Sequence, residues 1–420
     1  MPADWTQRLI AVLRSPLLPV WAVIALLPAG RSAEAAVALA AFGVLVFFLR
    51  HPRALGEHPG ARLLLVMWGC YTGAALISAI DAVNPGKSWG TIAADLRFAP
   101  LGLYACFAVR RVDRLVAVYR GVAVILVFWL IDAWIQAATG WSLGGPAEAE
   151  RLSGIFGAGN LKLGPALASL SAFLLWIARE RWGRRGLAVA VVVLLGPILL
   201  AGSRASWLVF GLVVLAFVWR DTRRPLPFVL AGLAALLLGV AAAGLAWRES
   251  GAFQARVQRT LLVLRGSPQD LDEALAGRLR IWTTSAAMIA AHPANGVGVR
   301  GFRNAYAAYA GPGDAFIADD GTGAAHAHQL VLEILTETGV IGLALWLIAA
   351  AAAIRAWWRA SGAARERAFA PAVALAATCF PLNTHLAFYS AWWGLLVWWL
   401  VGLYCAALYA DRVEGGSDAA

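Results

Sequence analysis

The sequence carries little charge for its length. Asp, Glu, Lys and Arg make up only 14% of its 420 residues, whereas roughly 25% is typical of soluble domains. Hydrophobic residues make up 61%, and the mean hydropathy is +0.70. This composition excludes a soluble multidomain protein and a disordered chain. The apolar residues form runs of about twenty rather than alternating ten-residue segments, which excludes a β-barrel and predicts an all-α polytopic membrane protein.

Lysine and cysteine are also scarce. Lys87 and Lys162 are the only lysines, so the net charge of +11 comes from arginines that cluster between apolar runs. That distribution argues against a nucleic-acid-binding surface. The four cysteines lie within apolar runs and form no CxxC pair, so we expect buried free thiols rather than metal ligands. They are Cys70, Cys106, Cys379 and Cys405.

The apolar runs predict about twelve membrane spans when they are compared with the roughly 20 residues that a bilayer requires. The spans fall near 16–30, 33–49, 63–80, 91–109, 115–137, 156–178, 187–201, 204–219, 226–246, 328–351, 368–388 and 390–410. Three regions follow from this division. Residues 1–246 hold the first nine spans, residues 247–327 form one large loop, and residues 328–420 hold the last three spans and a short tail.

The distribution of Lys and Arg predicts the orientation of these spans. With the N-terminus in the cytoplasm, cytoplasmic segments hold 21 of these residues and the short outer segments hold 5. Such a bias predicts that both termini are cytoplasmic and that residues 247–327 lie outside. A cleaved signal peptide is the competing interpretation of residues 1–30. Prolines at positions 16, 19 and 28 interrupt its apolar stretch, which favours an uncleaved first span.

The large outer loop is the first candidate for chemistry, because long loops usually carry function. Ser267 followed by a proline predicts a helix start, and apolar residues at helical spacing continue that helix to Ile289. A second amphipathic helix is expected over residues 253–264. Arg278 and Arg280 lie two positions apart on the first helix, so they should face different ways.

Two further features stand at predicted outer helix ends. Arg204 follows Gly202-Ser203 at the start of the eighth span, where free backbone N–H groups and a guanidinium favour an anion site. A lone arginine that snorkels to the interface is the alternative. His326 and His328 precede the tenth span, and we expect their side chains to diverge.

The histidine pair also allows a zinc interpretation, for which His292, Asp319 and Asp320 are the nearby candidates for a third ligand. Glu333 and Glu337 lie more than one turn further along the chain. We expect them to orient the helix rather than a histidine ring.

Several polar residues fall inside predicted spans and are functional candidates by default. They include Asp95, Arg97, Asp132, Gln136 and His385. A transporter that relays protons would need a connected chain of such groups, and the sequence does not suggest one.

Four motifs together resemble the bacterial O-antigen ligase/polymerase superfamily, and most closely the O-antigen ligases of lipopolysaccharide assembly. The motifs cover residues 200–345, and the predicted topology resembles these ligases over the whole chain. They are Ser203-Arg204; Gly277-Arg278 with Ile281-Trp282; His292-Pro293 with Gly296-Val297-Gly298 and Phe302; and His328-Gln329, nine residues, then Gly339-x-x-Gly342.

The resemblance implies a GT-C-like membrane glycosyltransferase of the bacterial inner membrane with a periplasmic active site. Its donor would be undecaprenyl diphosphate-linked O-antigen and its acceptor a sugar hydroxyl of lipid A–core, with membrane lipids as surroundings and no nucleic acid. It would need no metal, cofactor or ATP, and attack opposite the diphosphate would invert the anomeric centre.

The same resemblance selects site residues. His328 would be the catalytic base, because its spacing to Gly339 and Gly342 matches the ligase pattern, and Arg204 and Arg278 would bind the donor diphosphate. Four residues are possible supports: Arg280, His326, Arg300 and Arg303. An O-antigen polymerase, a protein O-oligosaccharyltransferase and, in a different class, a lipid or solute transporter remain as alternatives.

Overall fold

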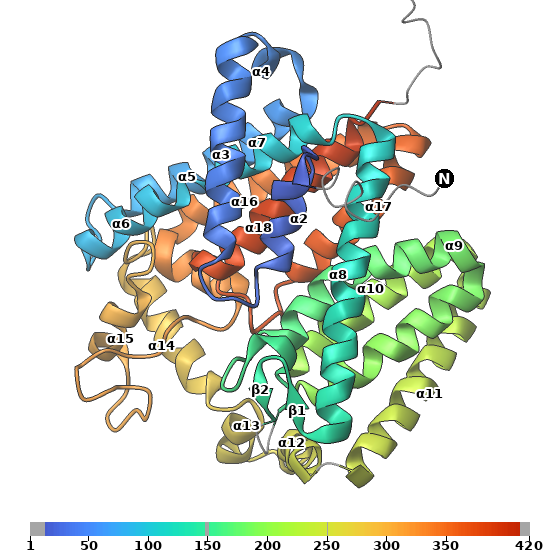
Figure 1. Cartoon of the computed structure of the whole chain (residues 1–420). Coiled ribbons are helices and arrows are strands. Elements are labelled where there is room, and N and C mark those ends of the chain that lie inside the picture. The colour runs from blue at the N-terminus through green and yellow to red at the C-terminus, as the bar shows by residue number, and fades with distance from the viewer. Residues whose placement is uncertain (1–12, 148–150, 250, 412–420) are drawn as a thin grey trace, which may run out of the picture.

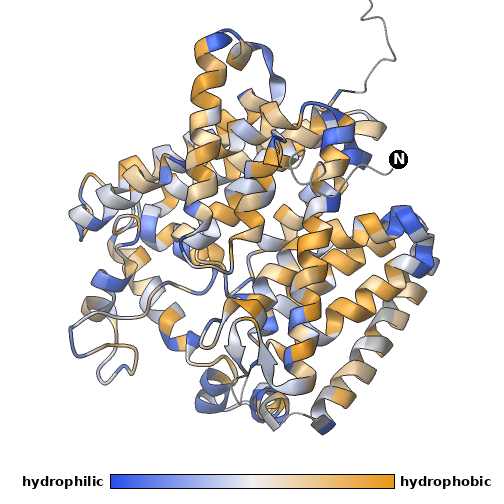
Figure 2. Cartoon of the chain, in the orientation of Figure 1, coloured by the Kyte–Doolittle hydropathy of each residue, from blue (hydrophilic) through white to orange (hydrophobic). Residues whose placement is uncertain are grey.

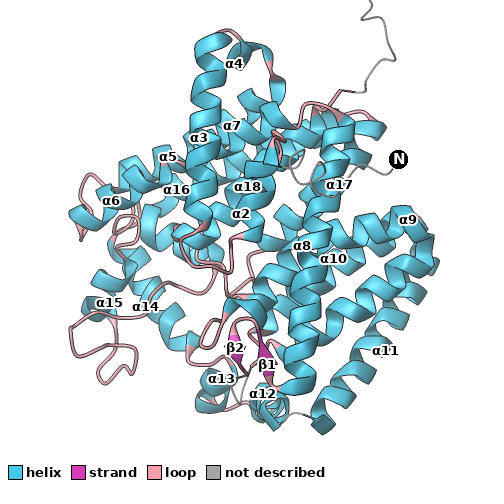
Figure 3. Ribbon diagram, viewed as in Figure 1, coloured by secondary structure: helices cyan, strands magenta, loops and turns pink. Residues whose placement is uncertain are grey.

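The computed structural model describes residues 13–147, 151–249 and 251–411. Within these ranges the secondary structure is helical apart from one short hairpin of β1 (Trp141–Ser142) and β2 (Gly145–Pro146), and loops connect the helices, as Figure 3 shows. The α-helices are α2 (Leu18–Ala25), α3 (Ala33–Arg50), α4 (Ala54–Glu57), α5 (Pro59–Ser78), α6 (Pro85–Asp95), α7 (Phe98–Ala108), α8 (Val112–Thr139), α9 (Leu163–Leu200), α10 (Arg204–Thr222), α11 (Pro225–Glu249), α12 (Gly251–Leu261), α13 (Pro268–Ala274), α14 (Arg278–Ala291), α15 (Phe302–Tyr309), α16 (Leu330–Arg359), α17 (Gly362–Thr378) and α18 (Ala391–Leu408).

Among the described residues, eight helices are long and apolar enough to cross a membrane. They are α3, α5, α8, α9, α10, α11, α16 and α18, and Figure 2 shows that hydrophobic residues, in orange, predominate in the long helices. The longest of them, α9, covers two of the predicted spans. It is interrupted at Gly183, whose φ of 64° and ψ of −153° are not helical, so its two limbs correspond to the sixth and seventh predicted spans.

Three predicted spans differ from the structure. The span over 91–109 is divided between α6 and α7, and the 11 residues of α7 reach only about 17 Å, too short to cross a bilayer alone. The span over 16–30 is represented by the eight residues of α2. The span over 368–388 ends early, at Thr378 in α17, because Pro381 disfavours helix for the residue before it.

The centre of the helix bundle is built around α18. Of its candidate span, 89% is buried inside the protein, and α7 packs along it. The close crossing requires a glycine at position 402, because a Cβ there would lie 2.7 Å from the Cα of Gly102. Small residues of this kind let membrane helices approach closely.

The loops predicted to be cytoplasmic gather at one end of the bundle. Arg179 in α9 pairs with Asp221 in α10 at 2.7 Å, and Arg220 pairs with both Glu180 in α9 and Glu366 in α17. The predicted outer segments meet at the other end, where the Val83 and Leu152 N–H groups donate to Val297 and Leu200 at 3.0 and 3.1 Å. Figure 1 shows α12 to α15 far from α4, in agreement with these two ends.

The large loop predicted over residues 247–327 is more helical than expected. Ser267 does cap a helix, since its side chain accepts the Asp270 N–H at 3.0 Å. The predicted continuous helix to Ile289 is wrong, however. It breaks after α13, because Ala276 and Gly277 both have positive φ values of 56° and 76°, and α14 then starts in a new direction at Arg278.

Candidate functional site

The candidate site lies where α14, the start of α16 and the segment between α17 and α18 meet. Its support is a kink in α16 at Gly339, which has a φ of 64°. The kink frees backbone N–H groups of the helix, and Val340 and Ile341 donate theirs to the carbonyls of Pro293 and Ala294 at 2.8 and 3.1 Å. A Cβ on Gly339 would lie 2.2 Å from the Ala294 oxygen, so this docking requires glycine. Two of the sequence motifs are thereby explained as one structural unit.

His328 occupies the turn just before α16. Its Nδ1 lies 2.9 Å from the carbonyl oxygen of Thr384. A carbonyl oxygen can only accept a hydrogen bond, so the proton of the neutral ring resides on Nδ1 and the lone pair is on Nε2. Burial, His326 and Arg278 lower the pKa of His328 to about 3, although the bond to Thr384 opposes this change. The ring is therefore neutral near pH 7 and its Nε2 can accept a proton.

His326 lies directly against His328, which corrects the expectation that the two side chains diverge. The ring centroids are 3.9 Å apart, and Nδ1 of His326 accepts the backbone N–H of His328 at 3.3 Å. The reason is the left-handed backbone of His328, whose φ is 54°. Burial and the charges of Arg300 and Arg278 lower the pKa of His326 to about 4, so this ring is also neutral.

Two carboxylates of α16 lie below the histidines and are fully buried. Glu333 places Oε2 3.4 Å from Nδ1 of His326, so it contacts a histidine ring, contrary to our expectation. Glu337 accepts the backbone N–H of Arg300 at 2.8 Å, and a φ of 59° at Arg300 turns the chain to allow this bond. Glu337 thus stabilises the turn at Arg300, and Glu333 contacts the ring that lies against His328.

Arg204 and Arg278 come from different elements and approach the same region. Nη1 of Arg204 donates to Oγ1 of Thr260 at 3.1 Å and to the carbonyl of Ala274 at 2.5 Å. Within the described part of the chain, the Arg278 guanidinium has neither a hydrogen-bond acceptor nor a counter-ion. Burial and the charge of Arg204 lower its pKa to about 10, so it stays charged at pH 7. Two such neighbouring cations favour a bound anion.

The three other arginines that the sequence suggested as supporting residues of the site differ in their surroundings. Arg280 points away from Arg278 and pairs with Asp272 at 2.6 Å, as the helix geometry predicted. Arg303 is exposed and donates to Oγ1 of Thr322 at 3.1 Å. Arg300 lies close enough to His326 and the buried glutamates for its charge to influence them. Of these residues, Arg300 alone therefore belongs to the surroundings of the histidine pair.

The zinc interpretation finds no support in the geometry. Nε2 of His292 lies 2.8 Å from the Tyr309 hydroxyl, which gives this ring a different partner. Across the described ranges, no group of three or more His, Cys, Asp or Glu residues is arranged to hold a metal ion.

The sequence alone did not place Thr384 and His385 at this site. Thr384 contributes only its backbone carbonyl, which any residue type would supply and which therefore leaves no signal in the sequence. His385 was expected inside a membrane span but lies in the irregular segment between α17 and α18. Burial, Arg278 and His328 lower its pKa to about 3, and it directly follows Thr384 in the chain.

The fold and the site together define a polytopic membrane protein with a half-buried neutral histidine and unpaired guanidinium charge at one end of its helix bundle. Residues 190–347 match the family model described as O-antigen ligase, and they contain Arg204, Arg278 and His328. This stretch is an O-antigen ligase family domain, of the ligase- and polymerase-type membrane enzymes of glycan assembly. No curated protein shows a significant match to the chain.

Proposed function

We propose that the protein is an inverting glycosyltransferase that moves O-antigen polysaccharide from undecaprenyl diphosphate to a sugar hydroxyl of lipid A–core. The reaction would take place on the periplasmic face of the bacterial inner membrane, with both termini in the cytoplasm. The observation that carries the proposal is the hydrogen bond from His328 Nδ1–H to Thr384, because it leaves Nε2 free to act as a base.

The chemistry can be followed atom by atom. The acceptor hydroxyl attacks the anomeric carbon of the donor sugar, and its proton passes to Nε2 of His328. The bond between the anomeric carbon and the diphosphate oxygen breaks on the opposite face. Arg204 and Arg278 stabilise the negative charge that develops on the departing undecaprenyl diphosphate. Neither ATP nor a metal ion enters this scheme, since the donor is already activated.

An apolar hollow in the helix bundle supports the proposal that the substrate is linked to a lipid. It has a volume of about 420 Å³ and lies between α5, α16, α17 and α18, with tryptophans 346, 357 and 398 among its lining residues. Phe388 and Tyr389 also line it and belong to the same segment as Thr384. A hydrocarbon chain in this hollow would therefore lie close to the proposed reaction centre.

The direct test uses purified protein, lipid-linked O-antigen and rough lipopolysaccharide. Ligation should attach one preformed polysaccharide to lipid A–core, which appears as a single large shift of the core band on a gel. Elongation of the lipid-linked glycan without attachment to the core would instead identify a polymerase. Movement of the donor across a vesicle membrane without a new glycosidic bond would identify a transporter.

A further inference from the structure

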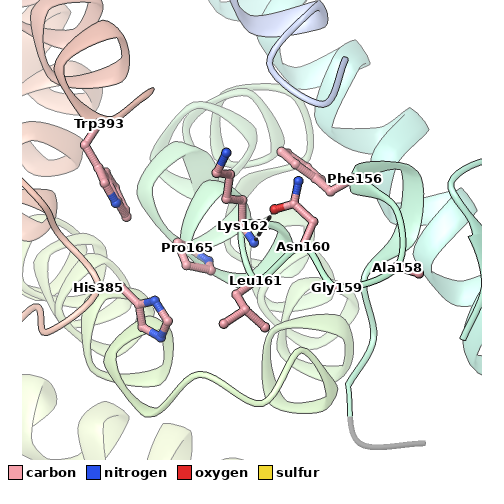
Figure 4. A pocket seen from close by; sticks show the side chains of 9 residues that line it. All are labelled: Phe156, Ala158, Gly159, Asn160, Leu161, Lys162, Pro165, His385 and Trp393. Atoms are coloured by element: carbon pink, nitrogen blue, oxygen red, sulfur yellow. Dashed lines mark hydrogen bonds between the residues drawn. The ribbon is translucent and has the colours of Figure 1, made fainter. Parts of the chain in front are cut away.

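A polar pocket lies next to the candidate site, outside the part of the chain that matches the O-antigen ligase family model. It has a volume of about 540 Å³ and is bounded by residues 156–165 on one side and by His385 and Trp393 on the other. Figure 4 shows the Trp393 and His385 side chains facing the segment that carries Lys162 across the pocket. His385 directly follows Thr384, whose carbonyl holds His328, so one short segment connects the pocket with the candidate base.

Three side chains of this pocket have unused hydrogen-bonding capacity. The Lys162 ammonium lies 5.3 Å from the centre of the Trp392 ring, and no carboxylate of the described residues pairs with it. The side-chain oxygen of Asn160 accepts the backbone N–H of Lys162 at 3.1 Å, which leaves the side-chain N–H groups of Asn160 free. The His385 ring likewise has no hydrogen-bond partner among the residues that the structure describes.

This combination of groups is suited to an anionic sugar. An indole face offers an apolar platform for the C–H groups of a sugar ring, and donors around it fix the orientation of the hydroxyls. An unpaired ammonium attracts a phosphate or a carboxylate. Unlike the apolar hollow described above, the pocket has an ammonium, an amide and an imidazole on its lining.

The location of the pocket indicates which of the two substrates, the donor or the acceptor, would bind in it. In an inverting displacement, the acceptor and the leaving group lie on opposite faces of the anomeric carbon. Neither Arg204 nor Arg278 lines this pocket, whereas His385 lines it and directly follows Thr384, whose carbonyl holds the histidine that would deprotonate the acceptor. We propose that the pocket bounded by Lys162, Asn160, His385 and Trp393 is the acceptor site, and that it recognises a saccharide carrying an anionic group. This inference rests on the proposed glycosyl transfer.

The test exploits the presence of two lysines in the chain. Lys162→Met should raise the KM for rough lipopolysaccharide about tenfold or more, as expected for the loss of a charge-assisted contact, and leave the KM for the lipid-linked donor within about twofold. Lys162→Arg should restore most of the affinity. Lys87→Met is the matched control, because Lys87 is exposed and lies outside the pocket, and it should change neither KM.

The acceptor can be varied in parallel. With rough lipopolysaccharide that has been both dephosphorylated and carboxyl-reduced, the wild type and Lys162→Met should have the same acceptor KM. Acceptors with only one of these modifications identify the anion as phosphate or carboxylate. A rise in the donor KM, or an equal effect of Lys162→Met on charged and neutral acceptors, would overturn the assignment.

A binding measurement separates this inference from the proposed function. The delipidated core oligosaccharide of rough lipopolysaccharide is titrated calorimetrically into wild type and Lys162→Met, without a donor. Binding that requires Lys162 in a protein that transfers no glycan would support the anionic-saccharide site and refute the proposed function. Transfer to lipid A–core together with binding that is indifferent to Lys162 would refute the site and leave the proposed function intact.

Discussion

Nδ1 of His328 donates a hydrogen bond to the carbonyl oxygen of Thr384 over 2.9 Å, across 56 positions of sequence. This contact fixes both the tautomer and the direction of the ring, and it connects the start of α16 to the segment before α18. A base that is held in this way needs no reorganisation when the acceptor arrives. Because this contact involves the ring of His328 but not the rings of His326 and His385, substitutions can test the three histidines separately.

His328→Ala should lower kcat by about 10²- to 10⁴-fold, the usual contribution of a positioned base, because no other group then takes the acceptor proton. Binding of the lipid-linked donor should persist. The measurement is single-turnover glycan transfer beside equilibrium donor binding. His326→Asn is the matched comparison, because an amide oxygen can still accept the His328 N–H, and this variant should keep most of the activity. If His328→Ala no longer binds donor, His328 is a diphosphate ligand instead.

The transfer rate should be nearly constant between pH 5 and pH 8. A base must be unprotonated to act, and a pKa of about 3 keeps His328 neutral above that value, so activity is lost only as the pH falls toward it. An ordinary solvated histidine, with a pKa of about 6.5, would lose roughly thirtyfold of its neutral form by pH 5. A rate profile with its midpoint near 6.5 at saturating donor would show that the ring is solvated during turnover.

Arg278→Ala should reduce transfer by about 10²-fold or more, because it removes a charge aimed at the departing diphosphate. Lysine should rescue poorly at this position, since it lacks the planar pair of donors. Arg280→Ala is the matched control on the same helix and should retain activity, as Arg280 pairs with Asp272 instead. The reverse outcome, with Arg280 essential and Arg278 dispensable, would contradict the assignment of α14 faces.

Chelators should leave the activity unchanged, because the proposed positive charge comes from Arg204 and Arg278. The measurement compares initial transfer rates of purified protein before and after treatment with EDTA, followed by removal of the chelator. Strong inhibition that added zinc or magnesium reverses would refute the metal-independent scheme.

The orientation of the chain can be tested by labelling single cysteines in a variant without the four native ones. Leu264→Cys should react with an impermeant reagent in cells with a permeabilised outer membrane, because this exposed residue lies in the predicted periplasmic segment. Trp182→Cys, exposed near the kink of α9, should be protected until the inner membrane is opened. Labelling in the opposite pattern would invert the topology.

The sequence alone determined the class of protein and several of its local features. Long apolar runs require helices in a bilayer, because every backbone polar group must be satisfied within the segment. Local rules also held over short distances, as in the cap at Ser267 and the opposite directions of Arg278 and Arg280. The spacing from His328 to Gly339 also marks a motif, whose structural role is the kink in α16.

Only the tertiary structure decided how these pieces meet. The expectation that His326 and His328 diverge assumed ordinary helical or extended backbone, and a positive φ at His328 reverses it. The contact with Thr384 depends on a backbone atom distant in sequence, and the pocket at Lys162 depends on two segments that are more than 200 residues apart. Side-chain patterning reports which faces are apolar, but it carries no information on contacts made by backbone groups of remote loops, so those contacts emerge only when the chain is folded.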